Sequence, residues 1–113
     1  MAENAKVITI PYKGKTYTLE FSRDVVRMME NQGFNIDNID TKPVTTIPDL
    51  FAGAFRKNHA SVSRKTINDI YDHMTHRDKL ITKLVEMYYE TVEALFDEPE
   101  EGEEGNANWD ATW

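Results

Sequence analysis

Residues 6–12 read Lys-Val-Ile-Thr-Ile-Pro-Tyr and residues 16–21 read Thr-Tyr-Thr-Leu-Glu-Phe, and these two stretches decide the N-terminal fold. Both are rich in β-branched and aromatic residues that alternate along the chain, which is typical of strands. Between them lies Lys13-Gly14-Lys15, whose glycine can adopt the positive φ of a tight hairpin loop. One face of this predicted β-hairpin carries Ile8, Ile10, Tyr12, Tyr17, Leu19 and Phe21. Because Pro11 cannot donate a ladder hydrogen bond, we expect its strand to lie at an edge.

Four helical segments are predicted after the hairpin, since apolar residues recur there at helical spacing. The expected helices cover roughly 23–32, the stretch from near Pro48 to about Asn58, Arg64 to about Thr75, and Asp78 to about Phe96. Ser22 and Ser63 stand where N-caps belong, and Gly33 offers a left-handed stop. Pro48 suits a first helical turn. The stretch from Phe34 to Thr45 is predicted as an ordered loop whose Phe34, Ile36 and Ile39 are anchored.

The fourth predicted helix carries more apolar residues than one buried stripe requires. They are Leu80, Ile81, Leu84, Val85, Met87, Tyr88, Tyr89, Val92, Leu95 and Phe96. A soluble helix with an extra apolar stripe usually has a partner. We therefore expect this helix to contact the core on one side and something else on the other.

The chain of 113 residues, 40% of them hydrophobic, is long enough for one core. The sequence predicts an α+β fold with an N-terminal β-hairpin, about four α-helices and a disordered acidic C-terminal tail. We expect a single domain over residues 1–96. Residues 97–113 are expected to form the flexible tail, which ends in Trp109-Asp-Ala-Thr-Trp113.

The net charge of −7 is concentrated in the tail. Six of the 20 acidic residues lie between Asp97 and Glu104, which leaves 14 acidic against 13 basic residues elsewhere, a net charge of −1. With no basic stripe, the protein is not expected to bind nucleic acid. It has no cysteine and no apolar run of signal-peptide or membrane-spanning length, so a cytoplasmic protein without a membrane partner is predicted.

No catalytic or metal-binding constellation stands out. The three histidines, His59, His73 and His76, have no glycine-bounded Ser beside them, and no Cys is present. His73 and His76, with Asp69 and Asp72 alongside, could offer ligands to a metal, but a further distant ligand cluster is lacking. The sequence also contains no phosphate-binding glycine motif. The prediction is a non-enzyme without metal or cofactor.

Candidate partner-binding residues are large apolar side chains. They are Phe51, Phe55, Met87, Tyr89, Trp109 and Trp113. Phe51 and Phe55 also fit a simple core role, and Met87 and Tyr89 are placed equally well in the core or at an interface. For the two tryptophans, a docking motif and a frayed tail are both compatible with the sequence.

The chain resembles the tail assembly chaperones of siphophages and prophages of Gram-positive bacteria along almost its whole length. The resemblance rests on Ile8-Thr-Ile-Pro-Tyr-Lys-Gly-Lys-Thr-Tyr-Thr-Leu-Glu-Phe-Ser, Met29-Glu-Asn-Gln-Gly-Phe-Asn-Ile and Ile47-Pro-Asp-Leu-Phe-Ala-Gly-Ala-Phe-Arg-Lys-Asn-His. It continues through Ile70-Tyr-Asp, Leu84-Val-Glu-Met-Tyr and the acidic tail that closes on Gly105-Asn-Ala-Asn-Trp109. It is a likeness of sequence, not of a catalytic signature.

This resemblance implies a chaperone domain in the host cytoplasm that binds the long helical tape measure protein and keeps it soluble. Such a chaperone is absent from the mature virion and is displaced by tail tube subunits. In these families a programmed frameshift commonly adds a C-terminal extension that recruits the tube protein, and an end at Trp113 would fit the unshifted product. Self-association is expected, because coating a long client takes many copies.

Two other function classes remain open. A small acidic regulator or DNA mimic would hold carboxylates on rigid elements at phosphate-like spacing. An enzyme would need a pocket with a perturbed titrating group.

Overall fold

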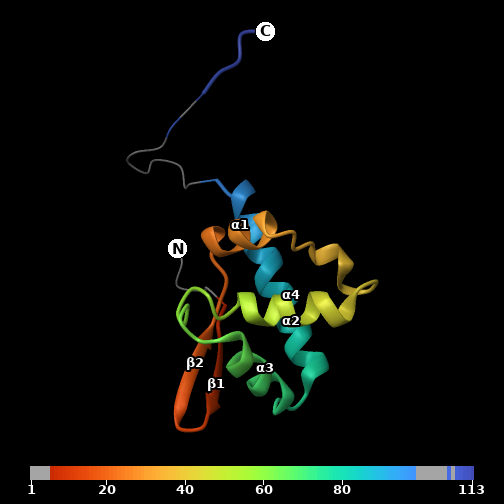
Figure 1. The fold of residues 1–113 in the computed structure, drawn as a ribbon. Helices are drawn as coiled ribbons and strands as arrows, with labels where there is room; N and C mark the ends of the chain where they lie inside the picture. Colours follow the sequence, from red (N-terminus) through yellow and green to blue (C-terminus); the bar gives the residue numbers. More distant parts are fainter. Residues whose placement is uncertain (1–5, 99–106, 108) are drawn as a thin grey trace.

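The computed structural model describes residues 6–98, 107 and 109–113, and it shows a two-stranded antiparallel hairpin followed by four α-helices (Figure 1). The elements are β1 (Ile8–Tyr12), β2 (Lys15–Leu19), α1 (Arg23–Asn31), the 3-10 turn η2 (Ile36–Ile39), α2 (Pro43–Gly53), α3 (Arg64–Asp72), α4 (Arg77–Glu93) and the 3-10 turn η3 (Ala94–Phe96). The predicted α+β class, with its hairpin and four helices, is confirmed. The predicted tail over 97–113 falls largely on residues 99–106 and 108, outside the described part.

The hairpin turns through Lys13 and Gly14, whose φ values are +50° and +81°. Two consecutive positive φ values define the primed turn that matches strand twist, and Gly14 adopts its value without steric cost. Tyr12 pairs with Lys15 across this two-residue loop, so the next pair, Pro11 with Thr16, is the non-hydrogen-bonded kind. Pro11 therefore faces the outer edge of the sheet, as predicted.

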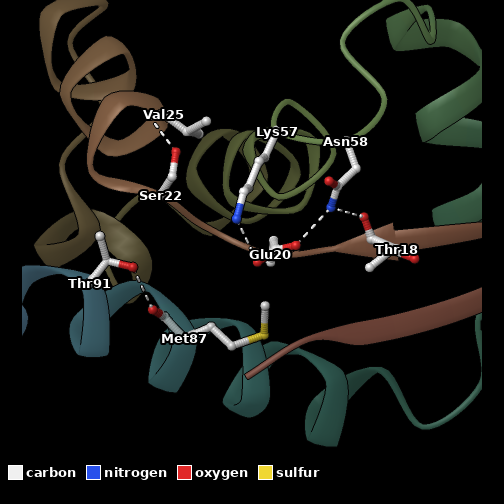
Figure 2. Close-up of polar contacts among 8 residues, drawn as sticks. All are labelled: Thr18, Glu20, Ser22, Val25, Lys57, Asn58, Met87 and Thr91. Carbon is white, nitrogen blue, oxygen red and sulfur yellow. Dashed lines mark hydrogen bonds and ion pairs between the residues drawn. The ribbon is translucent and has the colours of Figure 1, made fainter. Parts of the chain in front are cut away.

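The outer edge of β2 is closed by the segment that follows α2 (Figure 2). The backbone N–H of Glu20 donates to the Ala54 carbonyl at 3.0 Å, and that of Thr18 donates to His59 Nε2 at 2.9 Å. Asn58 Nδ2 donates in turn to the Thr18 carbonyl at 3.2 Å. Because unpaired backbone groups at a strand edge invite pairing with another chain, this segment protects one side of the small sheet.

Helix α1 begins and ends as its sequence signals predict. Ser22 Oγ accepts a hydrogen bond from the Val25 N–H at 3.2 Å, and Gly33 adopts a φ of +95° after the last turn. The stretch after it was predicted as an anchored loop, and Ile36 is indeed buried. Part of that stretch is nevertheless helical, because η2 lies there and α2 starts at Pro43.

The predicted bounds of the second helix are wrong at both ends. Helix α2 starts five residues before Pro48, which lies inside it, and it stops at Gly53, with turns continuing to Asn58. Pro43 takes the first helical position, where the missing N–H costs nothing. Inside the helix, Pro48 leaves the Val44 carbonyl without its usual donor. Val44 is 87% exposed, so water can bind that carbonyl.

The last two helices lie close to their predicted ranges. Ser63 Oγ accepts from the Thr66 N–H at 3.1 Å and caps α3, which ends at Asp72, short of the predicted Thr75. His76 turns the chain with a φ of +52° and α4 follows directly. Helix α4 crosses behind α2, and its two ends lie near α3 and α1 (Figure 1).

One hydrophobic cluster draws on the hairpin and all four helices. Its largest fully buried side chains are Leu19, Leu50, Phe51, Phe55, Ile70 and Leu84. Aromatic rings run through it, since the Phe55 ring lies 5.1 Å from that of Phe51 and 5.7 Å from that of Tyr17.

In the part of the chain that the structure describes, none of the helices combines the length and apolar character needed to cross a bilayer.

Candidate functional site

Two of the predicted partner-binding residues, Phe51 and Phe55, belong to the core and not to the surface. Their exposed fractions are 1% and 0%. Phe51 lies near the end of α2 and Phe55 in the turn that follows it. The two rings pack edge to face, and the Phe51 ring also lies 5.2 Å from the Tyr71 ring of α3. The prediction that they contact a partner is therefore corrected: both side chains are used within the domain.

Met87 is also buried, with an exposed fraction of 5%. Figure 2 shows its side chain directed from α4 toward the start of β1, while its carbonyl accepts a hydrogen bond from Thr91 Oγ1 at 3.2 Å. The core-facing side of α4 includes Leu84, Met87 and Tyr88, which fall at i, i+3 and i+4 on one helix face. Met87 thus fills the space under the hairpin, which corrects its predicted role at an interface.

The other three predicted residues are on the surface. Tyr89 is 40% exposed and donates its hydroxyl hydrogen to Asp37 Oδ1 at 3.4 Å. Trp109 and Trp113 are 85% and 103% exposed. The structure therefore leaves these three side chains accessible, although they lie in separate parts of the chain.

Tyr89 is joined by apolar side chains that sequence reasoning did not single out as partner-binding. Leu95 and Phe96 in η3 are 55% and 82% exposed, and Val92 is half-buried one turn before them. Tyr89 and Val92 fall at i and i+3 on α4, the spacing of one helix face, and Leu95 and Phe96 follow in η3. We call the set Tyr89, Val92, Leu95 and Phe96 the apolar end of α4. The extra apolar residues of the fourth predicted helix were the signal for it.

A second accessible apolar region lies between α2 and α3. It is a groove of about 690 Å³ lined by Pro43, Val44, Ile47, Pro48, Phe51, Arg64, Asn68, Tyr71 and Asp72. Of these residues Phe51 is 1% exposed and Val44 is 87% exposed. The sequence did not reveal this groove, because the predicted second helix omitted the first turn that builds one wall.

The histidines do not converge on a reactive centre. His59 accepts from the backbone of Thr18, and the His73 ring nitrogen Nδ1 lies 2.7 Å from the Asp69 carbonyl in its own helix. Within residues 6–98, 107 and 109–113, no group of three or more His, Asp or Glu side chains is placed to hold a metal ion.

Electrostatics distinguish the α4 end from the rest of the molecule. Burial, with the carboxylates of Glu30 and Asp37 and the neighbouring Tyr89, raises the pKa of the Tyr88 phenol to about 12. The rings of Phe21 and Phe34 pack against Tyr88 at 5.6 Å and 5.4 Å. The Tyr88 ring lies 6.1 Å from that of Tyr89, so a buried aromatic cluster with acidic neighbours lies next to the exposed Tyr89.

Comparison with known proteins gives a family without an assigned activity. No curated protein and no solved structure matches the chain. A family profile described as "Domain of unknown function (DUF5055)" matches residues 1–113. The match extends over the hairpin, the four helices and the C-terminal segment, and on this basis the chain belongs to the DUF5055 family.

Proposed function

We propose that this protein is a phage tail assembly chaperone that binds and solubilises the tape measure protein in the host cytoplasm. It acts before the tail is complete and is absent from the mature virion. The resemblance of its sequence to tail assembly chaperones motivates the proposal, which also includes recruitment of tail tube subunits through a longer, frameshifted form and self-association of the chaperone.

The observation that carries the proposal is the concentration of accessible apolar side chains toward the C-terminal side. Seven large hydrophobic residues are exposed in the described part, and five of them, Tyr89, Leu95, Phe96, Trp109 and Trp113, lie at or after position 89. Covering a Leu or Phe side chain contributes about 1.5–3 kcal/mol. The apolar end of α4 alone thus offers enough contact energy for a weak, releasable complex, which suits a chaperone whose client must later be handed on.

The acidic residues around that surface support the same proposal. From Glu86 to Glu104 the sequence contains nine acidic residues and no basic one. Like charge on each bound copy keeps coated clients apart and soluble. An apolar contact area next to a strongly acidic segment is what a holder of an aggregation-prone helix needs.

Co-expression tests the proposal directly. The tape measure protein is expressed alone and together with this chain, and its soluble fraction and co-purification are measured. We expect it to aggregate alone and to co-purify in soluble form with the chaperone. A tape measure protein that stays insoluble, or that is soluble without binding this chain, would refute the proposal.

A further inference from the structure

The apolar end of α4 is bordered by a parallel line of carboxylates. Glu90, Glu93 and Asp97 each follow directly after Tyr89, Val92 and Phe96, respectively. One residue step in an α-helix turns by about 100°, so Glu90 and Glu93 form an acidic line beside the apolar line of α4, and Asp97 follows η3 with an extended backbone. Glu86, four residues before Glu90, extends the acidic line toward the middle of the helix.

Further carboxylates come from α1 and η2. Asp37 of η2 accepts the hydrogen bond of the Tyr89 hydroxyl, and Glu30 of α1 lies close enough to Tyr88 to act on its titration together with Asp37. An acidic side chain of η2 therefore contacts the apolar surface at Tyr89, and Glu30 of α1 lies near the buried Tyr88 beside it.

Two of the carboxylates on α4 form ion pairs, and Lys6 also lies near enough to Glu93 to interact with its charge. Glu90 pairs with Lys6 at 3.1 Å and Glu86 with Lys83 at 3.6 Å. In the part of the chain that the structure describes, Glu30, Asp37, Glu93 and Asp97 form no ion pair within 4.0 Å. The C-terminal end of a helix also carries partial negative charge, and the last turn of α4 contains no basic residue to offset it.

We propose that the apolar end of α4 binds an amphipathic helix of the client whose apolar face is bordered by Lys and Arg residues. The apolar stripe supplies the contact area, and the unpaired carboxylates select for cationic borders. A second copy of this chain is a poorer occupant, because pairing two such ends would bring like charges together. The inference rests on the proposed function in that the helix belongs to the client.

Two synthetic peptides of about 20 residues test the selection. They share the same Leu- and Phe-rich helical face and differ in their flanks, which are Lys in one and Glu in the other. Binding of each labelled peptide to the full chain is followed by fluorescence anisotropy. We expect the Lys peptide to bind at least about tenfold more tightly at low salt. The difference should shrink strongly at about 1 M salt, where the screening length is about 3 Å.

Matched variants locate the effect. The double substitution Glu93→Lys and Asp97→Lys should remove the preference for the Lys peptide, because it reverses the local charge. Asp69→Lys with Asp72→Lys on α3 changes the net charge equally and should keep the preference. The double variant Leu95→Ser, Phe96→Ser should bind neither peptide. A circular dichroism spectrum unchanged from wild type shows that this variant is folded.

The outcomes separate the inference from the proposed function. Equal binding of both peptides, or equal loss of preference in the α3 control, overturns the inference even if the tape measure protein still co-purifies. If the peptides bind with the expected charge preference but the tape measure protein is not solubilised, the inference about this surface is supported and the proposed client is refuted. No binding of either peptide, with an oligomer that Leu95→Ser and Phe96→Ser dissociate, would assign this surface to a second copy and overturn the inference.

Discussion

His59 Nε2 accepts a hydrogen bond from the backbone N–H of Thr18 at 2.9 Å, and it thereby fastens the segment after α2 to the outer edge of β2. The accepting nitrogen carries no proton, so the hydrogen of the neutral imidazole is on Nδ1. The ring also packs against Tyr17, edge to face, with the ring centres 5.1 Å apart. One side chain therefore joins two parts of the fold that lie 41 residues apart in the sequence.

Replacing His59 with Phe should destabilise the fold by about 1–2 kcal/mol, since the ring contact with Tyr17 remains while the Thr18 N–H loses its acceptor. Urea denaturation followed by circular dichroism measures the change. His59→Gln, which can return an acceptor oxygen, should recover part of the loss. A Phe variant as stable as wild type would show that water replaces the imidazole at no cost.

Gly53→Ala should also destabilise the domain. A Cβ at this position would lie 2.5 Å from Met29 Sδ and 2.6 Å from Met29 Cε, so the end of this buried side chain must shift to make room for it. Overpacking of this kind costs about 1–3 kcal/mol, which exceeds the roughly 1 kcal/mol that alanine gains over glycine in a helix.

A double-mutant cycle with Met29→Ala checks that reason. In the Met29→Ala background the same Gly53→Ala change should be neutral or stabilising, because the clashing atoms are gone. Additive effects of the two substitutions would mean that the close approach of α1 and α2 is not the cause.

Glu20 should make the stability of the domain depend on acid pH. Hydrogen bonds from Asn58 and Lys57 lower the pKa of its carboxyl below the ordinary value of 4.5, against the opposing effect of burial. The folded state therefore binds this proton more weakly than the unfolded chain. Its contribution is fully present above pH 4.5 and is lost as the pH falls through the lowered pKa.

Glu20→Gln provides the comparison for this pH dependence. Denaturation at several pH values between about 6 and about 3 should show a steeper loss of stability in wild type than in the variant. Lys57→Met, which removes one of the two donors, should give an intermediate slope. Parallel curves for wild type and Glu20→Gln would show that this carboxyl is not responsible.

Replacing Trp109 and Trp113 together with Ala should leave the melting temperature within about 3 °C of wild type, since both side chains are almost fully exposed. If they anchor the client or a neighbouring copy, the complex should weaken although the monomer is unchanged. Differential scanning fluorimetry and analytical ultracentrifugation measure the two effects. A clear drop in melting temperature would show that the tryptophans pack on the body of the protein in solution.

Local sequence signals predicted the elements that depend on neighbouring residues. The turn at Gly14 and the caps at Ser22 and Ser63 follow from backbone requirements that a few residues satisfy. The start of α2 could not be chosen in this way, because Pro43 and Pro48 both suit a first helical turn. In the structure Pro48 lies inside the helix, and the exposed position of Val44 lets water reach the carbonyl that Pro48 leaves without a donor.

The candidate site was harder to predict than the helices and turns, because it depends on tertiary contacts. The excess of apolar residues in α4 predicted a second contact side. The sequence did not show, however, that Met87 is buried whereas Tyr89, two residues later, is exposed. The hairpin lies over Met87 and leaves Tyr89 accessible. Which of the two residues is covered depends on how β1 crosses α4. The hydrogen bond by which His59 closes the edge of β2 could not be predicted from the sequence either, since it joins segments that are distant along the chain.

Co-purification of the tape measure protein with surface variants of this chain tests the account most directly. Leu95→Ser with Phe96→Ser removes the two most exposed side chains of the apolar end of α4, and Val44→Ser removes an equally accessible apolar side chain from α2. The account predicts that wild type and Val44→Ser hold the tape measure protein in solution, whereas the folded Leu95→Ser, Phe96→Ser variant does not. Full solubilisation by that variant would contradict the account.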